Sequence, residues 1–143
     1  MKSEKINLFL VDDDALFLKL LEIEFLKHAD FLIECFATGE SCVDNLFLNP
    51  DVVILDYHLD NFNKTALTGI ETMDKIKLYD PNILIIILSA QDKIDVAVEC
   101  MQHNAFDYVV KDETAFLRLQ KIISNIFEYQ KMEKELKWYL DTN

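Results

Sequence analysis

Four apolar runs of this sequence end in side chains that can bind a cation, a phosphate or a proton. Asp12 and Asp13 follow the first run, Asp56 the third, Ser89 the fourth and Lys111 the fifth. Clustered carboxylates remain ionised together at low cost only when a cation lies among them. Oxygen ligands around an open site suit Mg²⁺, which keeps several of its waters. The aspartates therefore predict a magnesium site.

The serine and the lysine indicate what else that site would hold. The ammonium of Lys111 is a compact charge suited to a phosphate oxygen, and the hydroxyl of Ser89 can donate to another. A carboxylate between a metal and a lysine can attack phosphorus as a nucleophile while both cations neutralise charge. At any single position, an aspartate that turns the chain or caps a helix is the simpler interpretation. For all the positions together we favour a phosphoryl-transfer site.

The apolar periodicity predicts the elements that position these residues. Short apolar runs predict strands at 6–11, 31–36, 52–55, 83–88 and 108–110. Amphipathic runs predict helices at 15–28, 38–48, 69–79, 92–104 and from about 114 to 140. Alternating strands and helices form a doubly wound α/β domain around a parallel sheet. Ligands bind at the carboxyl ends of such strands, where the polar residues listed above fall.

Composition limits the classes of protein and partner. The chain has 143 residues, 51% of them hydrophobic, and a net charge of −12, which predicts one acidic globular domain. Anionic surfaces repel nucleic acids and acidic membranes, so we expect no direct binding to either. The three cysteines follow no metal-binding pattern, and no apolar run reaches the length of a membrane span or signal peptide. A cytoplasmic location is therefore expected.

The sequence resembles the response-regulator receiver domains of two-component signalling. The matching motifs occur in order, VDD at 11–13, ILD at 54–56, LSA at 88–90 and YVVK at 108–111, and the resemblance covers about residues 5–127. It implies a flavodoxin-like five-stranded sheet of order 2-1-3-4-5. It also implies a phosphoprotein that takes a phosphoryl group from the phosphohistidine of a sensor histidine kinase, or from a phosphotransfer protein. We place the receiver domain at 1–128 and a C-terminal extension of the last helix at 129–143.

The resemblance implies specific roles around the metal. Asp56 would be the phosphoacceptor, and Asp13 and Asp56 would bind Mg²⁺ through their side chains. His58 would bind the ion through its backbone carbonyl, and Asp12 would orient a metal-bound water.

The resemblance also assigns residues to the phosphoryl group and to switching. Ser89 would hydrogen-bond the phosphoryl group and Lys111 would bridge it. Tyr108 matches the aromatic switch position of the family, although packing in the core would equally explain it. Phosphorylation would then alter a surface of the fourth helix, fifth strand and fifth helix, which could also form a homodimer.

Two departures from the family pattern stand beside the site. The segment from Asp56 to Gly69 carries an insertion, with Leu59-Asp60 in place of the usual Met-Pro. Asp112 replaces the usual proline after Lys111, and an extra carboxylate there could weaken the hold of the lysine on a phosphoryl group. We therefore keep a phosphorylation-independent interaction module as an alternative.

A haloacid-dehalogenase-like phosphohydrolase is the enzymatic alternative, because it also forms an aspartyl phosphate. Its D-x-D-x-[TV] motif would need threonine or valine where this chain has Leu16, although Asp12 and Asp14 have the required spacing. The sequence thus favours a signalling switch over an enzyme. Asp14 would instead cap the helix that follows it.

Overall fold

The computed structural model describes residues 5–28, 30–60, 63–90 and 93–142. The strands are β1 (Ile6–Val11), β2 (Phe31–Phe36), β3 (Val52–Asp56), β4 (Leu84–Ser89) and β5 (Asp107–Val110). The helices are α1 (Ala15–Leu26), α2 (Gly39–Asp44), α3 (Gly69–Tyr79), α4 (Ile94–Gln102) and α5 (Ala115–Thr142), with a 3₁₀ turn, η1, at Leu46–Leu48. The chain divides into two compact units, residues 1–112 and 113–143, which we describe separately.

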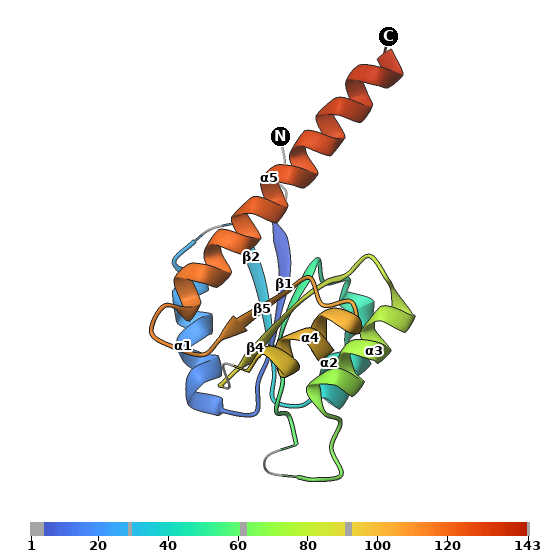
Figure 1. Cartoon of the computed structure of the whole chain (residues 1–143). Coiled ribbons are helices and arrows are strands. Elements are labelled where there is room, and N and C mark those ends of the chain that lie inside the picture. The colour runs from blue at the N-terminus through green and yellow to red at the C-terminus, as the bar shows by residue number, and fades with distance from the viewer. Residues whose placement is uncertain (1–4, 29, 61–62, 91–92, 143) are drawn as a thin grey trace. The chain divides into compact units, whose positions relative to one another are not determined.

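The first unit contains the sheet, whose order is β2-β1-β3-β4-β5 (Figure 1). Every pair of neighbouring strands is parallel. The predicted doubly wound α/β fold with sheet order 2-1-3-4-5 is therefore confirmed. In this unit α1 covers one face of the sheet, and α2, α3 and α4 cover the other (Figure 1).

Burial on both faces explains why the central strands are apolar throughout. All five residues of β3 are buried, as are five of the six residues of β4. A parallel strand between two layers of helices contacts apolar side chains on both sides, so its sequence shows no alternation. The carboxyl ends of these strands carry Asp56 and Ser89 into the buried edge of the sheet.

Side-chain caps set the starts of the helices on either side of the site. The carboxylate of Asp14 accepts hydrogen bonds from the backbone N–H groups of Leu16 and Phe17, which confirms its predicted role as the α1 cap. Thr68 and Glu71 form a capping box at the start of α3. These caps fix where each chain segment leaves the sheet edge.

The observed boundaries differ from the predicted ones by a few residues. The helix predicted over 38–48 is divided into α2 and η1, because the chain turns at Asn45 and ends at Asn49 with a left-handed φ of 59°. The helix predicted from Asp92 begins at Ile94, and Asp92 lies outside the described residues. Asn61 and Phe62, in the predicted insertion, also lie outside them.

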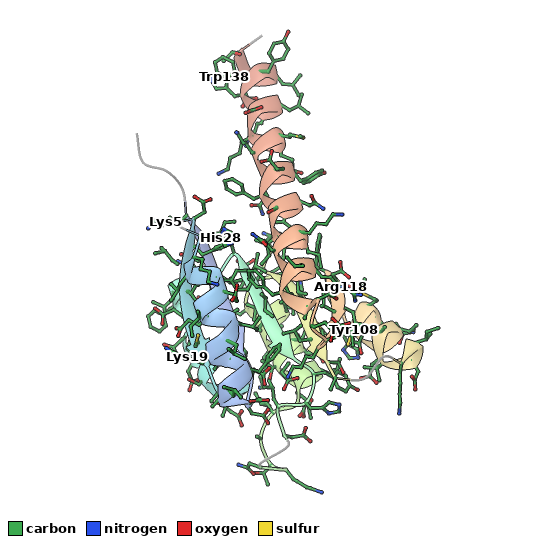
Figure 2. The ribbon with its side chains drawn as sticks, turned by 90° about the vertical axis from the view of Figure 1, so that its left-hand side faces the viewer. Lys5, Lys19, His28, Tyr108, Arg118 and Trp138 are labelled. Carbon is green, nitrogen blue, oxygen red and sulfur yellow. The ribbon has the colours of Figure 1, made fainter. Side chains whose placement is uncertain are left out.

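The second unit is a single 28-residue helix, α5. Its buried residues, Ala115, Leu119, Ile123 and Ile126, recur at helical spacing. Every residue from 128 to 142 is exposed, including Trp138 near the C-terminal end of the helix (Figure 2). Among the described residues, no helix combines the length and the apolar character that crossing a membrane requires.

Candidate functional site

Three carboxylates meet where β1 and β3 end. The strands are neighbours, and Val11 lies opposite Leu55. Asp12 and Asp56, the next residues on each strand, therefore lie side by side. One oxygen from each of Asp12, Asp13 and Asp56 lies within 4.8 Å of the others. Asp12 is 1% exposed and Asp56 is 2% exposed, whereas Asp13 is half-buried. The structure thus brings together the three aspartates that the sequence predicted.

Lys111 places its ammonium between two of these carboxylates. Its Nζ lies 2.7 Å from Oδ2 of Asp12 and 3.3 Å from Oδ1 of Asp56. Its backbone N–H donates to the carbonyl of Ser89 at 2.8 Å, so the lysine is also fixed to the end of β4. The side chain of Ser89 is buried. The Lys111 ammonium is therefore positioned beside Asp56, the predicted phosphoacceptor.

Burial and neighbouring charges shift the pKa values of Asp56 and Lys111. Burial raises the pKa of Asp56 to about 7, and the neighbouring Asp12 carboxylate adds to the rise, while Lys111 opposes it. Burial lowers the pKa of Lys111, but its contacts with Asp12 and Asp56 outweigh this effect, so the pKa is raised overall. The single positive charge of Lys111 does not balance the three carboxylates of Asp12, Asp13 and Asp56. The site is therefore suited to a further cation.

The site opens to solvent through a pocket of about 620 Å³. Its lining comprises Asp13, Asp14, Ala15, Leu16, Asp56, His58, Ala90 and Lys111. His58 donates its backbone N–H to Oδ1 of Asp56 at 3.4 Å. Tyr108 does not line the pocket; it lies half-buried on β5 and packs against the core.

Three features of the site were not predicted from sequence. The ring of Phe17 lies under the Lys111 ammonium, with Nζ 4.7 Å from the ring centroid. A side chain at Gly69 would meet the carbonyl oxygen of Asp56 at 2.5 Å. The hydroxyl of Tyr57 donates to Glu99 of α4 at 3.0 Å, which links the residue after the acceptor to that helix. A usable sequence signal existed for Gly69, one of only two glycines in the chain.

The profile of the response regulator receiver domain matches residues 8–126. The chain belongs to this family. The match covers β1 from Leu8 onward, the other four strands, and the aspartates, serine and lysine of the site. The sequence-based resemblance is therefore confirmed, and the protein is a response regulator receiver domain.

Curated relatives of this receiver domain include longer regulatory proteins and a short one. The chain is 25% identical over 134 residues to the transcriptional regulatory protein ZraR of Klebsiella oxytoca, covering 94% of this chain and 29% of ZraR. It is 30% identical over 104 residues to the chemotaxis protein CheY of Thermotoga maritima, covering 71% of this chain and 82% of CheY. The chain therefore spans less than a third of the length of ZraR.

Solved structures share the fold of this receiver domain. The signal receiver domain of a putative LuxO repressor protein from Vibrio parahaemolyticus superposes with a TM-score of 0.77 at 23% identity, covering 92% of this chain and 97% of that one. CheY in the CheX–CheY–BeF3–Mg²⁺ complex from Borrelia burgdorferi superposes with a TM-score of 0.73 at 28% identity, covering 86% of this chain and 90% of that one.

The loop between β3 and α3, where the sequence predicts an insertion, is anchored near each of its ends. Leu59 is buried in the core on one side, and on the other the backbone N–H of Leu67 donates to a carboxylate oxygen of Glu40 at 3.2 Å. Between them, Asn63 accepts hydrogen bonds from the backbone and hydroxyl of Thr65 and forms a local turn. Residues 57–60 and 63–68 extend from the lower edge of the domain in Figure 1.

Binding of Mg²⁺ is expected to depend on pH between 6 and 8. Because the pKa of Asp56 in the folded, metal-free protein is raised to about 7, protons compete with the cation below that pH. Raising the pH from 6 to 8 should strengthen Mg²⁺ binding by about tenfold. The effect is measured by titrating the protein with Mg²⁺ at pH 6 and at pH 8 and following the rise in its melting temperature. Asp56→Asn should lose the pH dependence, and identical wild-type titrations at both pH values would contradict the prediction.

Proposed function

We propose that this receiver domain is a phosphorylation-dependent signalling switch with Asp56 as its phosphoacceptor. The observation that carries the proposal is the position of the Asp56 carboxylate, 3.3 Å from the Lys111 ammonium and beside two further carboxylates, at the base of an open pocket. In the reaction, an oxygen of Asp56 bonds to phosphorus as the bond from phosphorus to the donor histidine nitrogen breaks. The phosphoryl donor would be a sensor histidine kinase or a phosphotransfer protein.

The residues of the chain fit a bound Mg²⁺. Asp12, Asp13 and Asp56 offer carboxylate oxygens within 4.8 Å of one another, and the Lys111 ammonium beside them supplies a single positive charge. The side chains of Asp13 and Asp56 and the carbonyl of His58 would hold the ion, with Asp12 positioning one of its waters. When bound, Mg²⁺ neutralises negative charge on the transferring phosphoryl group. The CheY complex from Borrelia burgdorferi that contains BeF3 and Mg²⁺ supports this assignment.

Lys111 and Ser89 act on the phosphoryl group in this proposal. The ammonium of Lys111 neutralises charge on one phosphoryl oxygen, and Ser89 donates its hydroxyl to another. Ser89 is buried at the end of β4, and in this proposal it moves toward the new group when its hydroxyl donates to it. We assign Tyr108, half-buried on the neighbouring β5, as the aromatic residue that responds to this movement.

The surface of α4 suits the readout of such a movement. Ile94, Val98 and Met101 of α4 lie one turn apart and are 84%, 48% and 50% exposed. An exposed apolar row of this kind marks a contact surface. As the resemblance implies, we propose that α4, β5 and α5 each take part in engaging a target or a second copy. We also propose that the C-terminal extension placed at 129–143 continues α5 as far as Thr142; Asn143 lies outside the described residues. The switch would act in the cytoplasm and would not turn over an external substrate.

Intact mass spectrometry with acetyl phosphate and Mg²⁺ tests the proposal. Wild-type protein should gain one phosphoryl group, and the exposed control Asp141→Asn should gain it equally. Rapid release of phosphate from many phosphomonoesters without an accumulated adduct would favour the hydrolase instead. The absence of any adduct, together with no spectral change on adding beryllofluoride, would favour a phosphorylation-independent module.

A further inference from the structure

Lys111 has a third neighbour besides its two carboxylates, the aromatic ring of Phe17. The ammonium lies 4.7 Å from the ring centroid, within the roughly 6 Å at which a cation is attracted to an aromatic face. Phe17 is half-buried, and the side chain of Lys111 is 16% exposed. Water therefore weakens this contact less than it weakens an exposed pair.

The position of Phe17 is set by the third aspartate of the VDDD motif. Oδ1 of Asp14 accepts hydrogen bonds from the backbone N–H of Leu16 at 3.1 Å and from that of Phe17 at 3.2 Å. These bonds start α1 and fix the backbone from which the ring projects. Asp14 thus acts on Lys111 indirectly, because it holds the residue that contacts the ammonium.

A lysine in this site needs a contact that survives the reaction. Its flexible four-carbon stem is tethered at the backbone by the bond to Ser89, and its charge is held by Asp12 and Asp56. In the proposed function, Asp56 becomes an acyl phosphate and Mg²⁺ competes for the same carboxylates. The ring of Phe17 changes in neither event, and it offers no oxygen that would compete with a phosphoryl group.

We propose that Phe17 is a positioning residue that keeps the Lys111 ammonium over the pocket while its carboxylate partners change. The inference rests on the function proposed above and adds a residue outside the motif positions of the site. It predicts that the electron density of the ring, and not only its volume, influences the rate at which Asp56 is phosphorylated.

Substitutions that separate ring character from volume test this role. Phe17→Leu should slow phosphorylation by acetyl phosphate about five- to tenfold, whereas Phe17→Tyr should stay close to the wild-type rate. Leu20→Ala, which truncates an exposed side chain of the same helix, is the matched control and should leave the rate unchanged. Equal rates for wild type and Phe17→Leu would overturn the proposal.

Two further measurements keep the test decisive. If Phe17→Leu does not fold, phenylalanine analogues carrying one, two and three fluorines can replace Phe17, because they preserve the shape of the ring. The rate of Asp56 phosphorylation should fall with each added fluorine, and a constant rate overturns the proposal. The NMR shift of the Lys111 ε-methylene protons should lose its ring-current contribution in Phe17→Leu, and an unchanged shift also overturns it. The NMR shift is measured without phosphorylation, so it tests the contact between Phe17 and Lys111 by itself. A wild-type protein that gains no phosphoryl group would instead refute the proposed function.

Discussion

The Asp56→Asn variant is expected to gain no phosphoryl group and, without Mg²⁺ at pH 8, to be more stable than the wild type. Both results follow from replacing one group, the Asp56 carboxylate, which is 2% exposed and lies beside another carboxylate. The amide cannot attack phosphorus through an ionised oxygen, so the adduct is lost. It also removes a charge that burial and Asp12 disfavour more than Lys111 favours.

The sign of the stability change follows from the direction of the pKa shift. The pKa of Asp56 rises from 3.8 to about 7 on folding, so the folded protein binds this proton more tightly than the unfolded chain. The free energy of unfolding therefore falls as the pH rises from about 4 to about 7, and the loss is complete above that range. Asparagine avoids this loss, which gives a gain on the order of 2–4 kcal/mol at pH 8 and almost none at pH 4.

Urea denaturation at pH 4 and pH 8 measures the gain, and intact mass measures the adduct. Asp141→Asn is the matched control, because it makes the same chemical change at an exposed position. A variant less stable than wild type at pH 8 would show that Asp56 contributes more through its contact with Lys111 than it costs by burial. Addition of Mg²⁺ should narrow the difference, since the ion compensates the charge only in the wild type.

The fold and the main site residues could be predicted because they depend on local patterns. The all-apolar run of β4 indicates a strand covered on both faces, and Asp56 and Lys111 were placed by the rule that parallel strands end at one edge. Periodicity gave strand β1 and helix α3 their observed bounds. The same rule brought the aspartates, the serine and the lysine to one site.

Contacts between distant segments could not be predicted in this way. Phe17 falls in the helix predicted over 15–28, and its periodicity does not reveal that Lys111, the residue after β5, lies over its ring. The hydrogen bond from Tyr57 to Glu99 joins residues 42 positions apart, and no local pattern encodes it. The helix predicted over 38–48 was wrong in its second half, because α2 ends at Asp44 and Leu46–Leu48 form a 3₁₀ turn instead.

Gly69→Ala is expected to slow the phosphorylation of Asp56 by more than tenfold and to destabilise the domain. A Cβ at this position would lie 2.5 Å from the carbonyl oxygen of Asp56 and 2.7 Å from that of Tyr57. Both obstacles are backbone atoms, so α3 or the end of β3 must shift. The backbone N–H of Gly69 also donates to Tyr57 at 3.1 Å, a bond that such a shift would lengthen. Strain of this kind costs about 1–3 kcal/mol, and small displacements of reacting groups cost large factors in rate.

Gly39→Ala is the matched control, because Gly39 also follows a threonine cap at the start of a helix. Its Cβ would clash with the side-chain oxygen of Thr72, and the three nearest atoms all belong to that threonine. We expect Gly39→Ala to lower the free energy of unfolding and to leave the phosphorylation rate of the folded protein near the wild-type value. The additional substitution Thr72→Ala should restore part of that stability, because it removes the obstructing oxygen. Urea denaturation and the rate of adduct formation separate the two variants, since only Gly69→Ala displaces the backbone that carries the acceptor. Equal rates for the two would show that the end of β3 absorbs the added methyl group without moving Asp56.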